Sequence, residues 1–474
     1  MLSWSALYIL IEWAIRLIML VVVPRRREPA SAMAWLVVIF FAPVPGFLVY
    51  AVIGRHRLPR RRIRLHRALT RRLRSFNLKM REQPSSVQPW LGAELNATVQ
   101  LASRLGQLPI LGGNHFDMII RTDDFIERLI EDINQARHHV HLLFYIYAND
   151  ATGRKVHDAL VQARQRGVTC RVLVDAVGSR PMIKRLGPEM MQSGIEVRQS
   201  LPVGLFRRQF ERVDLRNHRK IAVIDGRIGY TGSQNIVDAD YGYKDLLWED
   251  LMVRLTGPVV LELQSVFAED WYCETDEVLK GAKIYPSPEA YGEVMAQTLP
   301  SGPNYPTENY QRLVVAALHA ARERAIITTP YFVPDEPFRQ ALQIAAMRGI
   351  RVDLIVPHRS NHPLVDAASR AYYEELLESG VQIHRVGQAL VHAKTMSIDD
   401  KLALIGSGNF DIRSFTLNLE INMIFYGPEA TKTLRTHQQA YIDRSEAIQL
   451  EQWKKRPDGE RILQNSAKLL SPLL

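Results

Sequence analysis

The stretch HRKIAVID at positions 218–225 recurs as HAKTMSID at positions 392–399, so the chain repeats one motif after 174 residues. The run GSQN at 232–235 recurs as GSGN at 406–409 with the same offset. One His-x-Lys-x4-Asp match is a weak signal, because composition alone produces it occasionally in a chain of this length. Two copies with the same spacing to a following Ser and Asn are a strong signal. We therefore expect an internal duplication.

The sequence around each motif copy follows the same order of elements. Each copy comes after a helix-like stretch, a run of β-branched residues and a further apolar run, at 155–166, 170–174 and 194–197 and again at 338–348, 352–356 and 380–383. Strands alternating with amphipathic helices predict two α/β units with mostly buried sheets. We assign these units to residues 111–285 and 286–474. Because neither unit holds every group that a two-step reaction needs, the predicted site lies between them.

The repeated residue types suit chemistry at a phosphodiester. Of two histidines that face one phosphorus, the first can attack while the second protonates the leaving alcohol. Lys220 and Lys394 would supply fixed positive charge to the non-bridging oxygens. With these cations present the reaction requires no metal, and the sequence shows no carboxylate cluster to bind one. The predicted hydrogen-bond donors to the same oxygens are Ser233, Asn235, Ser407 and Asn409.

Four acidic residues are candidates for supporting roles. A histidine needs an acceptor on its second ring nitrogen to fix its tautomer, and a carboxylate inside an apolar strand is costly unless it is paired. Asp250 and Glu420 fit this description, so we assign them as histidine-orienting residues, although the sequence does not show which histidine each serves. Asp225 and Asp399 end a strand before a turn, and they either take part in the chemistry or brace that turn.

Residues 1–54 hold two apolar runs and are assigned as a membrane anchor. Residues 2–23 are long enough to span a bilayer. Glu12 and Arg16 lie inside this run at i and i+4, so they can neutralise each other. A charged pair inside a membrane is a candidate for function, but we favour the interpretation that it faces a neighbouring helix or reaches the interface. The run lacks a basic segment before it and a small-residue cleavage site after it, so we expect it to be retained.

The second apolar run, residues 32–53, contains Pro43, Pro45 and Gly46, which oppose one uninterrupted helix. Two arrangements stay open for it. It is either a second span or a re-entrant hairpin with its tip at 42–46. Only the hairpin keeps the basic residues on both of its flanks on the same side of the membrane, as the positive-inside tendency favours.

Positive charge is concentrated in one stretch. The formal net charge is +10, and residues 55–81 contain 12 Lys or Arg and no Asp or Glu, so the rest of the chain is close to neutral. A nucleic-acid enzyme would spread this charge over its binding face. A basic block beside an apolar run indicates a topology signal, attraction to anionic lipid, or both. Residues 55–110, which show no strong period, are predicted to be a juxtamembrane connector. The segment LFRRQFER at 205–212 suits either a membrane-interface lip or a solvated loop.

These residues carry a resemblance to a known family. The paired His-x-Lys-x4-Asp motif with its trailing Gly-Ser-x-Asn resembles the duplicated signature of the phospholipase D superfamily. The two apolar runs, the arginine-rich connector and the two motif-bearing units are together similar to bacterial cardiolipin synthases. The resemblance implies two phospholipase D-like α/β units related by pseudo-twofold symmetry, with the active site at their junction. The family motif falls on His218, Lys220, Asp225, His392, Lys394 and Asp399.

The resemblance also implies a reaction. Two phosphatidylglycerols would give cardiolipin and glycerol through a phosphohistidine, without a cofactor or a metal, with His218 as the nucleophile and His392 as the acid–base partner. It implies a bacterial inner-membrane protein that has its catalytic units on the cytoplasmic side and binds phosphatidylglycerol and anionic lipid rather than nucleic acid. The alternatives are a hydrolase, a synthase that uses phosphatidylethanolamine as co-substrate, a membrane-tethered nuclease and a non-enzymatic scaffold.

Overall fold

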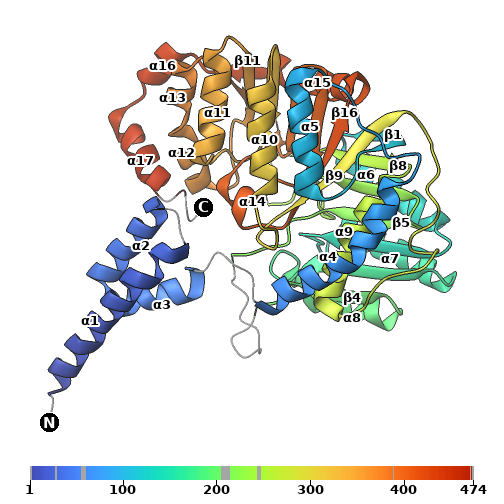
Figure 1. Ribbon diagram of the computed structural model, residues 1–474, viewed down its shortest axis with the longest axis horizontal. Helices are drawn as coiled ribbons and strands as arrows, with labels where there is room; N and C mark the ends of the chain where they lie inside the picture. Colours follow the sequence, from blue (N-terminus) through green and yellow to red (C-terminus); the bar gives the residue numbers. More distant parts are fainter. Residues whose placement is uncertain are drawn as a thin grey trace. The chain divides into compact units, whose positions relative to one another are not determined.

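The structure is a computed structural model that describes residues 3–26, 29–54, 60–203, 214–242, 247–387, 389–469 and 471. The chain folds into two compact units, a small one built mainly from residues 1–58 and a large one built mainly from residues 59–474. Figure 1 follows the chain from blue to red. The segment 205–212, predicted to be an interface lip or a solvated loop, lies outside the described residues.

The small unit consists of apolar helices. Helix α1 (Trp4–Val22) is followed by the short 3-10 helix η1 (Pro24–Arg26), α2 (Pro29–Phe41) and α3 (Pro43–Ile53). Among the described helices, α1 alone is long and apolar enough to cross a membrane. Proline has no N–H and its ring clashes with the preceding turn, so Pro43 ends α2 and begins a new helix. The prediction that the prolines prevent one uninterrupted helix is confirmed.

The large unit is organised around one 15-stranded sheet in which both halves of the sequence follow the same strand order. Outward from the centre, the order is β1-β8-β6-β5-β2-β3-β4 on one side and β9-β16-β15-β14-β10-β11-β12-β17 on the other. Strands β1 and β9 pair antiparallel at the centre, so the halves form one continuous sheet. The predicted duplication of an α/β unit is thus confirmed.

The strand bounds show how each motif is placed in this sheet. The first-half strands are β1 (Leu111–Ile119), β2 (His139–Phe144), β3 (Thr169–Asp175), β4 (Glu196–Ser200), β5 (Ile221–Ile224), β6 (Ile228–Gly232) and β8 (Met252–Thr256). The second-half strands are β9 (Val294–Ser301), β10 (Arg324–Thr328), β11 (Arg351–Pro357), β12 (Gln382–Val386), β14 (Thr395–Ile398), β15 (Leu402–Gly406), β16 (Glu420–Tyr426) and β17 (Ser445–Ala447). Each motif therefore runs through an antiparallel pair, β5–β6 or β14–β15.

Helices cover both faces of the sheet (Figure 1). One face of the first half packs against α6 (Thr122–Gln135), α7 (Ala151–Gln165) and α8 (Arg180–Gln192). The same layer in the second half contains α5 (Ala93–Gly106), α10 (Asn309–Ala320), α11 (Glu336–Met347), α12 (Pro363–Arg370) and α13 (Tyr373–Glu378), and α17 (Asp458–Leu469) packs on α12. The remaining short helices are α14 (Ile412–Thr416) and α16 (Leu450–Lys454).

The opposite face of the sheet packs against α9 (Val260–Thr275) and α15 (Pro428–Asp443). Their core contains buried residues of both halves, such as Phe267 with Val253 and Leu434 with Met423. Burial of apolar surface is the main stabilising contribution in folding. Because this core is shared, we expect the two halves to fold as one cooperative body.

The predicted connector is more ordered than its sequence suggested. Residues 60–81 form the helix α4 (Arg60–Arg81), which packs on α9. Arg62 pairs with Glu274, and Arg61 Nη2 lies 2.6 Å from the Asp276 carboxylate. Helix α5 contributes to the core of the second half. The sequence did not reveal this docking, because α4 contains many basic residues and too few apolar ones to show a helical periodicity.

Candidate active site

Two matching backbone pairings bring the motif copies together. The segment before His218 meets the segment before Glu420, and the amide of His218 donates to the carbonyl oxygen of Leu419 over 2.9 Å. In the second copy, β13 (Leu390–Val391) pairs in parallel with β7 (Trp248–Glu249), and the amide of His392 donates to the carbonyl of Glu249 over 2.8 Å. Each histidine is thus positioned by backbone of the opposite half.

The two histidines line one cavity of about 480 Å³. In an extended segment, residues two apart point to the same side, so the His-x-Lys spacing directs each lysine to the side of its histidine. Each β-hairpin then returns the chain to the trailing Asn. Both asparagines, Asn235 and Asn409, line the same cavity. The structure therefore brings the two imidazoles and two of the predicted hydrogen-bonding residues to one space.

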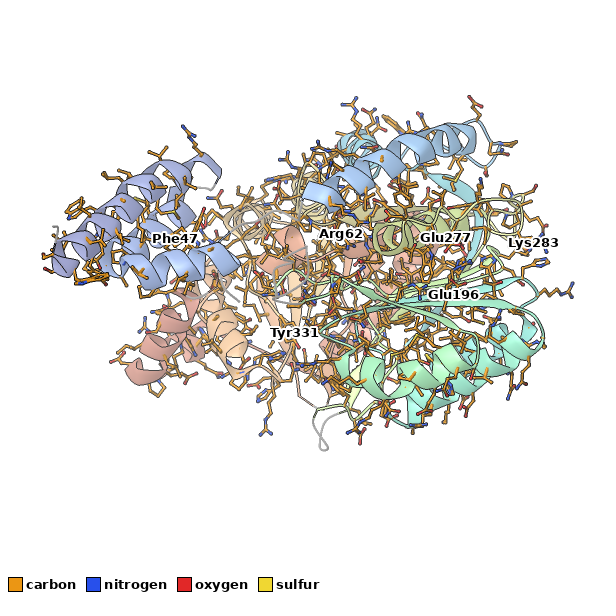
Figure 2. All side chains as sticks on the ribbon, turned by 90° about the horizontal axis from the view of Figure 1, so that it is seen from below. Phe47, Arg62, Glu196, Glu277, Lys283 and Tyr331 are labelled. Carbon is orange, nitrogen blue, oxygen red and sulfur yellow. The ribbon has the colours of Figure 1, made fainter. Side chains whose placement is uncertain are left out.

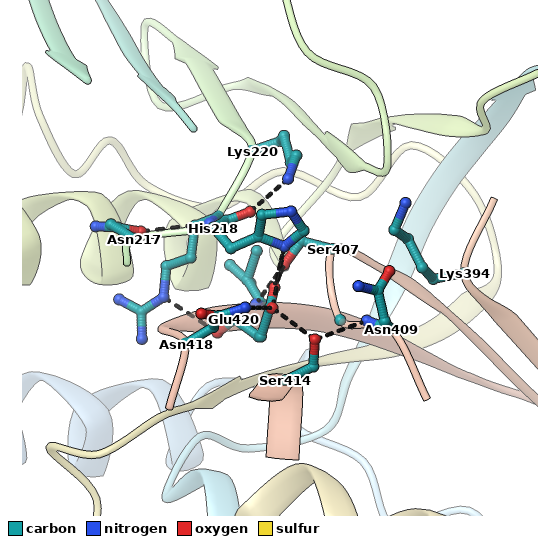
Figure 3. Close-up of polar contacts among 12 residues, drawn as sticks. Asn217, His218, Lys220, Lys394, Ser407, Asn409, Ser414, Asn418 and Glu420 are labelled. Carbon is teal, nitrogen blue, oxygen red and sulfur yellow. Dashed lines mark hydrogen bonds and ion pairs between the residues drawn. The ribbon is translucent and has the colours of Figure 1, made fainter. Parts of the chain in front are cut away.

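Each histidine is held by a carboxylate from the opposite half. His218 Nδ1 lies 3.0 Å from both Oε1 and Oε2 of Glu420 (Figure 3). His392 Nδ1 lies 2.6 Å from Oδ1 of Asp250. An Nδ1–H bonded to a carboxylate fixes the tautomer with the lone pair on Nε2. The sequence had left this pairing open, and in the structure the pairs cross between the halves.

The two serines contact the carboxylates instead of the cavity. Ser233 Oγ donates to Asp250 over 2.6 Å, and Ser407 Oγ donates to Glu420 over 2.5 Å. A hydroxyl has only one proton to donate. In this arrangement the serines position the carboxylates that hold the histidines, and their predicted donation to the substrate stays a prediction.

The motif lysines are buried beside the histidines. Lys220 Nζ donates to the carbonyl oxygen of His218 over 2.7 Å and lies 5.5 Å from the centre of the Tyr145 ring. Lys394 Nζ donates to the carbonyl oxygen of His392. Burial lowers the pKa of Lys220 to about 8, against the opposing effects of Glu420 and Asp250. Burial also lowers the pKa of Lys394, and the charge of Lys220 adds to this effect.

The asparagines and their neighbours form the polar part of the cavity wall. Asn235 Oδ1 accepts a hydrogen bond from the amide of Ile146 over 3.0 Å. Asn409 Nδ2 donates to Asp411 Oδ2 over 3.0 Å. Each amide group therefore has one atom engaged by the protein. Their second polar atoms remain the candidates for substrate contact.

Burial controls the ionisation of both histidines. It lowers the pKa of His218 to about 4, and Glu420 only partly opposes this. It lowers the pKa of His392 to about 4 as well, with a further lowering by Lys394. Burial alone would raise the pKa of Asp250, but the charge and hydrogen bond of His392 lower it to about 2. Near neutral pH the site thus contains neutral imidazoles and ionised carboxylates.

The motif aspartates lie at hairpin turns. Asp225 Oδ1 accepts from the amides of His138 and His139, and its Oδ2 accepts from the amide of Arg137, each over 2.8 Å. Asp399 receives three equivalent backbone hydrogen bonds from residues 322–324. Neither aspartate lines the cavity. Of the two predicted roles, the geometry supports the brace, and direct participation of these residues in the chemistry stays a prediction.

Several cavity residues were not found from the sequence. Tyr145 and Trp248 contact His218 and His392 edge-on, with ring centres 4.9 and 4.7 Å apart. A signal existed for tyrosine, since Tyr145 and Tyr331 both follow the second strand of their half and line the cavity. The charged wall residues Arg216, Asp411 and Arg413 have no counterpart of the same type in the repeat, so the duplication did not reveal them.

In the parts of the chain that the structure describes, no group of three or more His, Cys, Asp or Glu residues is close enough to hold a metal ion. The expectation that the reaction requires none stays a prediction.

Comparison with known proteins places the chain in a family. Residues 129–271 and 314–441 match the family model described as cardiolipin synthase, phospholipase D-like domain, and residues 13–55 match the phospholipase D-nuclease N-terminal model. Cardiolipin synthase A from Proteus mirabilis (strain HI4320) is 36% identical over 96% of this chain and 95% of that protein. Cardiolipin synthase A from Pectobacterium carotovorum subsp. carotovorum (strain PC1) is 36% identical over 95% of this chain and 94% of that protein.

A solved structure shares the fold. The crystal structure of phosphatidylserine synthase from Haemophilus influenzae Rd KW20 superposes with a TM-score of 0.61 at 15% identity, covering 80% of this chain and 99% of that one. Identity this low supports a common fold alone. The resemblance predicted from the duplicated motif is confirmed by the family match and by the near full-length relatives. The chain belongs to the cardiolipin synthase family of phospholipase D-like proteins.

Proposed function

We propose that this protein is a phosphatidyltransferase that joins two phosphatidylglycerols into cardiolipin and releases glycerol. The observation that carries the proposal is one cavity lined by two histidines, each hydrogen-bonded through Nδ1 to a buried carboxylate of the opposite half. Relatives that match this chain over nearly its whole length are named cardiolipin synthase A. Their name supports the choice of a lipid hydroxyl, and not water, as the acceptor.

In the proposed first step, Nε2 of His218 attacks phosphorus while the bond from phosphorus to the glycerol oxygen breaks. His392, protonated on Nε2, gives its proton to the departing oxygen, so neutral glycerol leaves. The new phosphohistidine retains its proton on Nδ1 and carries positive charge on the ring. Glu420, at 3.0 Å through both oxygens, stabilises that charge.

In the second step, the terminal hydroxyl of another phosphatidylglycerol passes its proton to His392, and its oxygen attacks the same phosphorus. The P–N bond breaks, and its electron pair returns to Nε2 of His218. Both histidines regain their starting protonation, and one phosphodiester has been exchanged for another. The transfer therefore needs no external source of energy.

The motif lysines support this exchange electrostatically. An ammonium group has three N–H donors, and Lys220 and Lys394 each use one on a histidine carbonyl oxygen. Neither lysine lines the cavity, so the proposed stabilisation of the non-bridging oxygens, where charge is highest in the transition state, acts through the positive charge of the buried ammonium groups. A bound phosphodiester also brings negative charge beside His392. That charge offsets burial and the effect of Lys394, so it raises the pKa of His392 and favours the protonated acid.

The proposed location is the bacterial inner membrane, with the large unit on the cytoplasmic side. The apolar helix α1 supports attachment to a bilayer. Helix α4 is basic, and its residues Arg64 and Arg67 are exposed while Arg62 and His66 are buried. Exposed basic residues are attracted to anionic lipid by about 1 kcal/mol each when they lie near the surface. This face of α4 would thus favour membranes rich in phosphatidylglycerol.

A product assay tests the proposal directly. The purified full-length protein would be supplied with phosphatidylglycerol vesicles, and lipids and free glycerol would be quantified by mass spectrometry. We expect one glycerol for each cardiolipin formed, and the same result for a Lys283→Ala control on the exposed surface of the large unit (Figure 2). Phosphatidic acid as the main product would show that the protein is a hydrolase and not a synthase. Ethanolamine release from added phosphatidylethanolamine would identify the alternative co-substrate.

A further inference from the structure

We propose that α2 and α3 form a re-entrant hairpin that enters and leaves the bilayer on the same face, and that Arg16 of α1 holds its tip. The chain then crosses the membrane once, through α1. The inference rests on helix lengths and contacts within the small unit and on the basic residues that flank its helices, and it does not depend on which reaction the large unit performs.

Helix length is the first observation. At a rise of 1.5 Å per residue, a bilayer core of about 30 Å requires close to 20 residues. Helix α1 has 19 residues, whereas α2 has 13 and α3 has 11. Neither short helix spans the core alone. They would span it together only if they continued in one direction.

The contacts between α2 and α3 show that the chain doubles back instead. The rings of Trp35 and Tyr50 meet edge-on with their centres 5.1 Å apart. Residues 15 apart along one continuous helix would be about 22 Å apart. Nearer the break, a Cβ built on Gly46 would lie 3.0 Å from the Cα of Ile39, a tight contact that a side chain would force apart, so glycine favours this close approach. The two helices therefore lie antiparallel, with the break after Ala42 as the tip.

The tip would be costly in lipid without a polar partner. A chain break leaves carbonyl oxygens without helical donors, and no water replaces them in the bilayer core. Arg16 Nε donates to the carbonyl oxygen of Phe40 over 3.2 Å, in the last turn of α2. Its Nη1 lies 3.3 Å from Oε2 of Glu12, which balances its charge. This gives the charged pair in α1 a structural purpose: it supplies a neutral, hydrogen-bonding cap for the broken helix.

The charges outside the helices fit the same arrangement. Arg25 and Arg26 follow α1, and the basic block that includes α4 follows α3. A hairpin returns the chain to the face on which it started, so both basic stretches share that face. A full span would place them on opposite faces, against the positive-inside tendency. The re-entrant arrangement thus resolves the conflict in the sequence.

Cysteine labelling tests the topology. Cys170 and Cys273 are buried and would first be replaced by Ala, with an unchanged thermal unfolding temperature in detergent as the check on folding. Single cysteines at Ser5, Arg25 and Lys283 would then be treated with a membrane-impermeant maleimide in sealed vesicles of each orientation. We expect Arg25→Cys and Lys283→Cys to react from the same face and Ser5→Cys from the other. Reaction of Arg25→Cys only from the face opposite Lys283→Cys would overturn the hairpin.

A matched pair of variants tests the role of Arg16. Arg16→Lys retains a charged donor, whereas Arg16→Leu removes it. With a reporter cysteine at Ala42, we expect the Leu variant to react with the maleimide at least 10-fold faster than the Lys variant, because the unpaired carbonyl draws water to the tip. Equal labelling rates would show that Arg16 does not hold the tip. The topology result with Arg25→Cys stands apart from this outcome.

Discussion

The two sides of the cavity share their reacting groups but differ in what surrounds them. On each side a carboxylate from the opposite half holds a histidine and accepts a hydrogen bond from a serine. Glu420 accepts two further side-chain hydrogen bonds, from Ser414 over 3.0 Å and from Asn418 over 3.3 Å. Among the side chains whose positions are described, Asp250 is bonded only to His392 and Ser233.

The cavity wall near each histidine differs in the same way, with more polar groups near His218. Arg216 and Arg413 lie close enough to lower the pKa of Tyr145, against the dominant effect of burial, and Tyr145 contacts His218. The equivalent positions in the repeat hold Leu390 and Ala239. Both copies of the duplicated unit thus retain the histidine, carboxylate and serine that the proposed chemistry at phosphorus uses on each side. The copies diverge around each histidine: the His218 side is the more polar one, because Glu420 accepts two extra side-chain hydrogen bonds and because Leu390 and Ala239 replace the two arginines in the repeat. A ring that carries positive charge in an intermediate suits the polar side.

Removing each histidine should separate the two sides most strongly. With phosphatidylglycerol we expect His218→Ala and His392→Ala to lose at least about 10³-fold in rate, within the range for removal of a positioned proton-transfer or nucleophilic group. A phosphatidyl nitrophenol donor needs no protonation of its leaving group. His392→Ala should therefore release about one equivalent of nitrophenol per protein in a burst, and His218→Ala none. A burst from His218→Ala alone would exchange the two roles.

Removing the charge of each carboxylate should move different limbs of the pH–rate profile. Glu420 raises the pKa of His218, so Glu420→Gln lowers it. The nucleophile must be neutral, so the decline of kcat at low pH should shift to still lower pH. Asp250 raises the pKa of His392, so Asp250→Asn lowers it. The acid must be protonated, so the decline at high pH should begin at lower pH.

Both carboxylate variants should also lose about 10- to 100-fold in kcat, the rate equivalent of a hydrogen bond to a charged group. The measurement is kcat across the pH range at saturating phosphatidylglycerol in mixed micelles. If Glu420→Gln instead shifted the decline at high pH and Asp250→Asn the decline at low pH, the assignment of nucleophile and acid would be reversed. Unchanged limbs in both variants would show that neither carboxylate controls its histidine.

Replacing each serine should also lower kcat by different amounts on the two sides of the cavity, but less than replacing the carboxylates. Ser233→Ala leaves Asp250 with His392 as its described side-chain partner, so we expect about a 10-fold loss in kcat. Ser407→Ala leaves Glu420 with Ser414 and Asn418 in addition to its histidine. We expect a loss of about 3-fold there. Steady-state kinetics of the two variants side by side decide this, and equal losses would contradict the proposed difference in support.

The duplicated motif predicted a large part of this arrangement. Two copies with one spacing implied two α/β units and a shared site, and the burial cost of a lone carboxylate implied that Asp250 and Glu420 orient histidines. The crossing of these pairs was beyond the sequence, because the partners are 142 and 202 residues apart along the chain. Only the packing of one half on the other decides which carboxylate reaches which ring.

The serines and α4 show two different limits of sequence reasoning. A buried serine near a phosphate site has the right chemistry for the substrate, and only the coordinates show that a carboxylate already takes its single proton. Helix α4 is too rich in arginine to display an apolar stripe. Its buried side includes His66, which is paired with Glu269, and Arg62, so polar contacts dock it on α9.

Replacing either motif aspartate should lower the stability by a similar amount in both halves. Of the substitutions considered, these should change kcat least. Asp225 and Asp399 have φ of 53° and 48°, a left-handed conformation that Asn tolerates as well as Asp. Asp→Asn at either position therefore leaves the turn unstrained but replaces one acceptor oxygen by a donor that faces a backbone N–H. We expect the free energy of unfolding to fall by about 1–3 kcal/mol in each variant, and kcat to change by less than about 2-fold because neither side chain lines the cavity. Denaturant unfolding in detergent and steady-state kinetics on the same samples measure both quantities. A large loss of kcat at unchanged stability would show that these residues take part in the reaction. Unequal destabilisation of the two variants would show that the asymmetry of the cavity extends to the two turns.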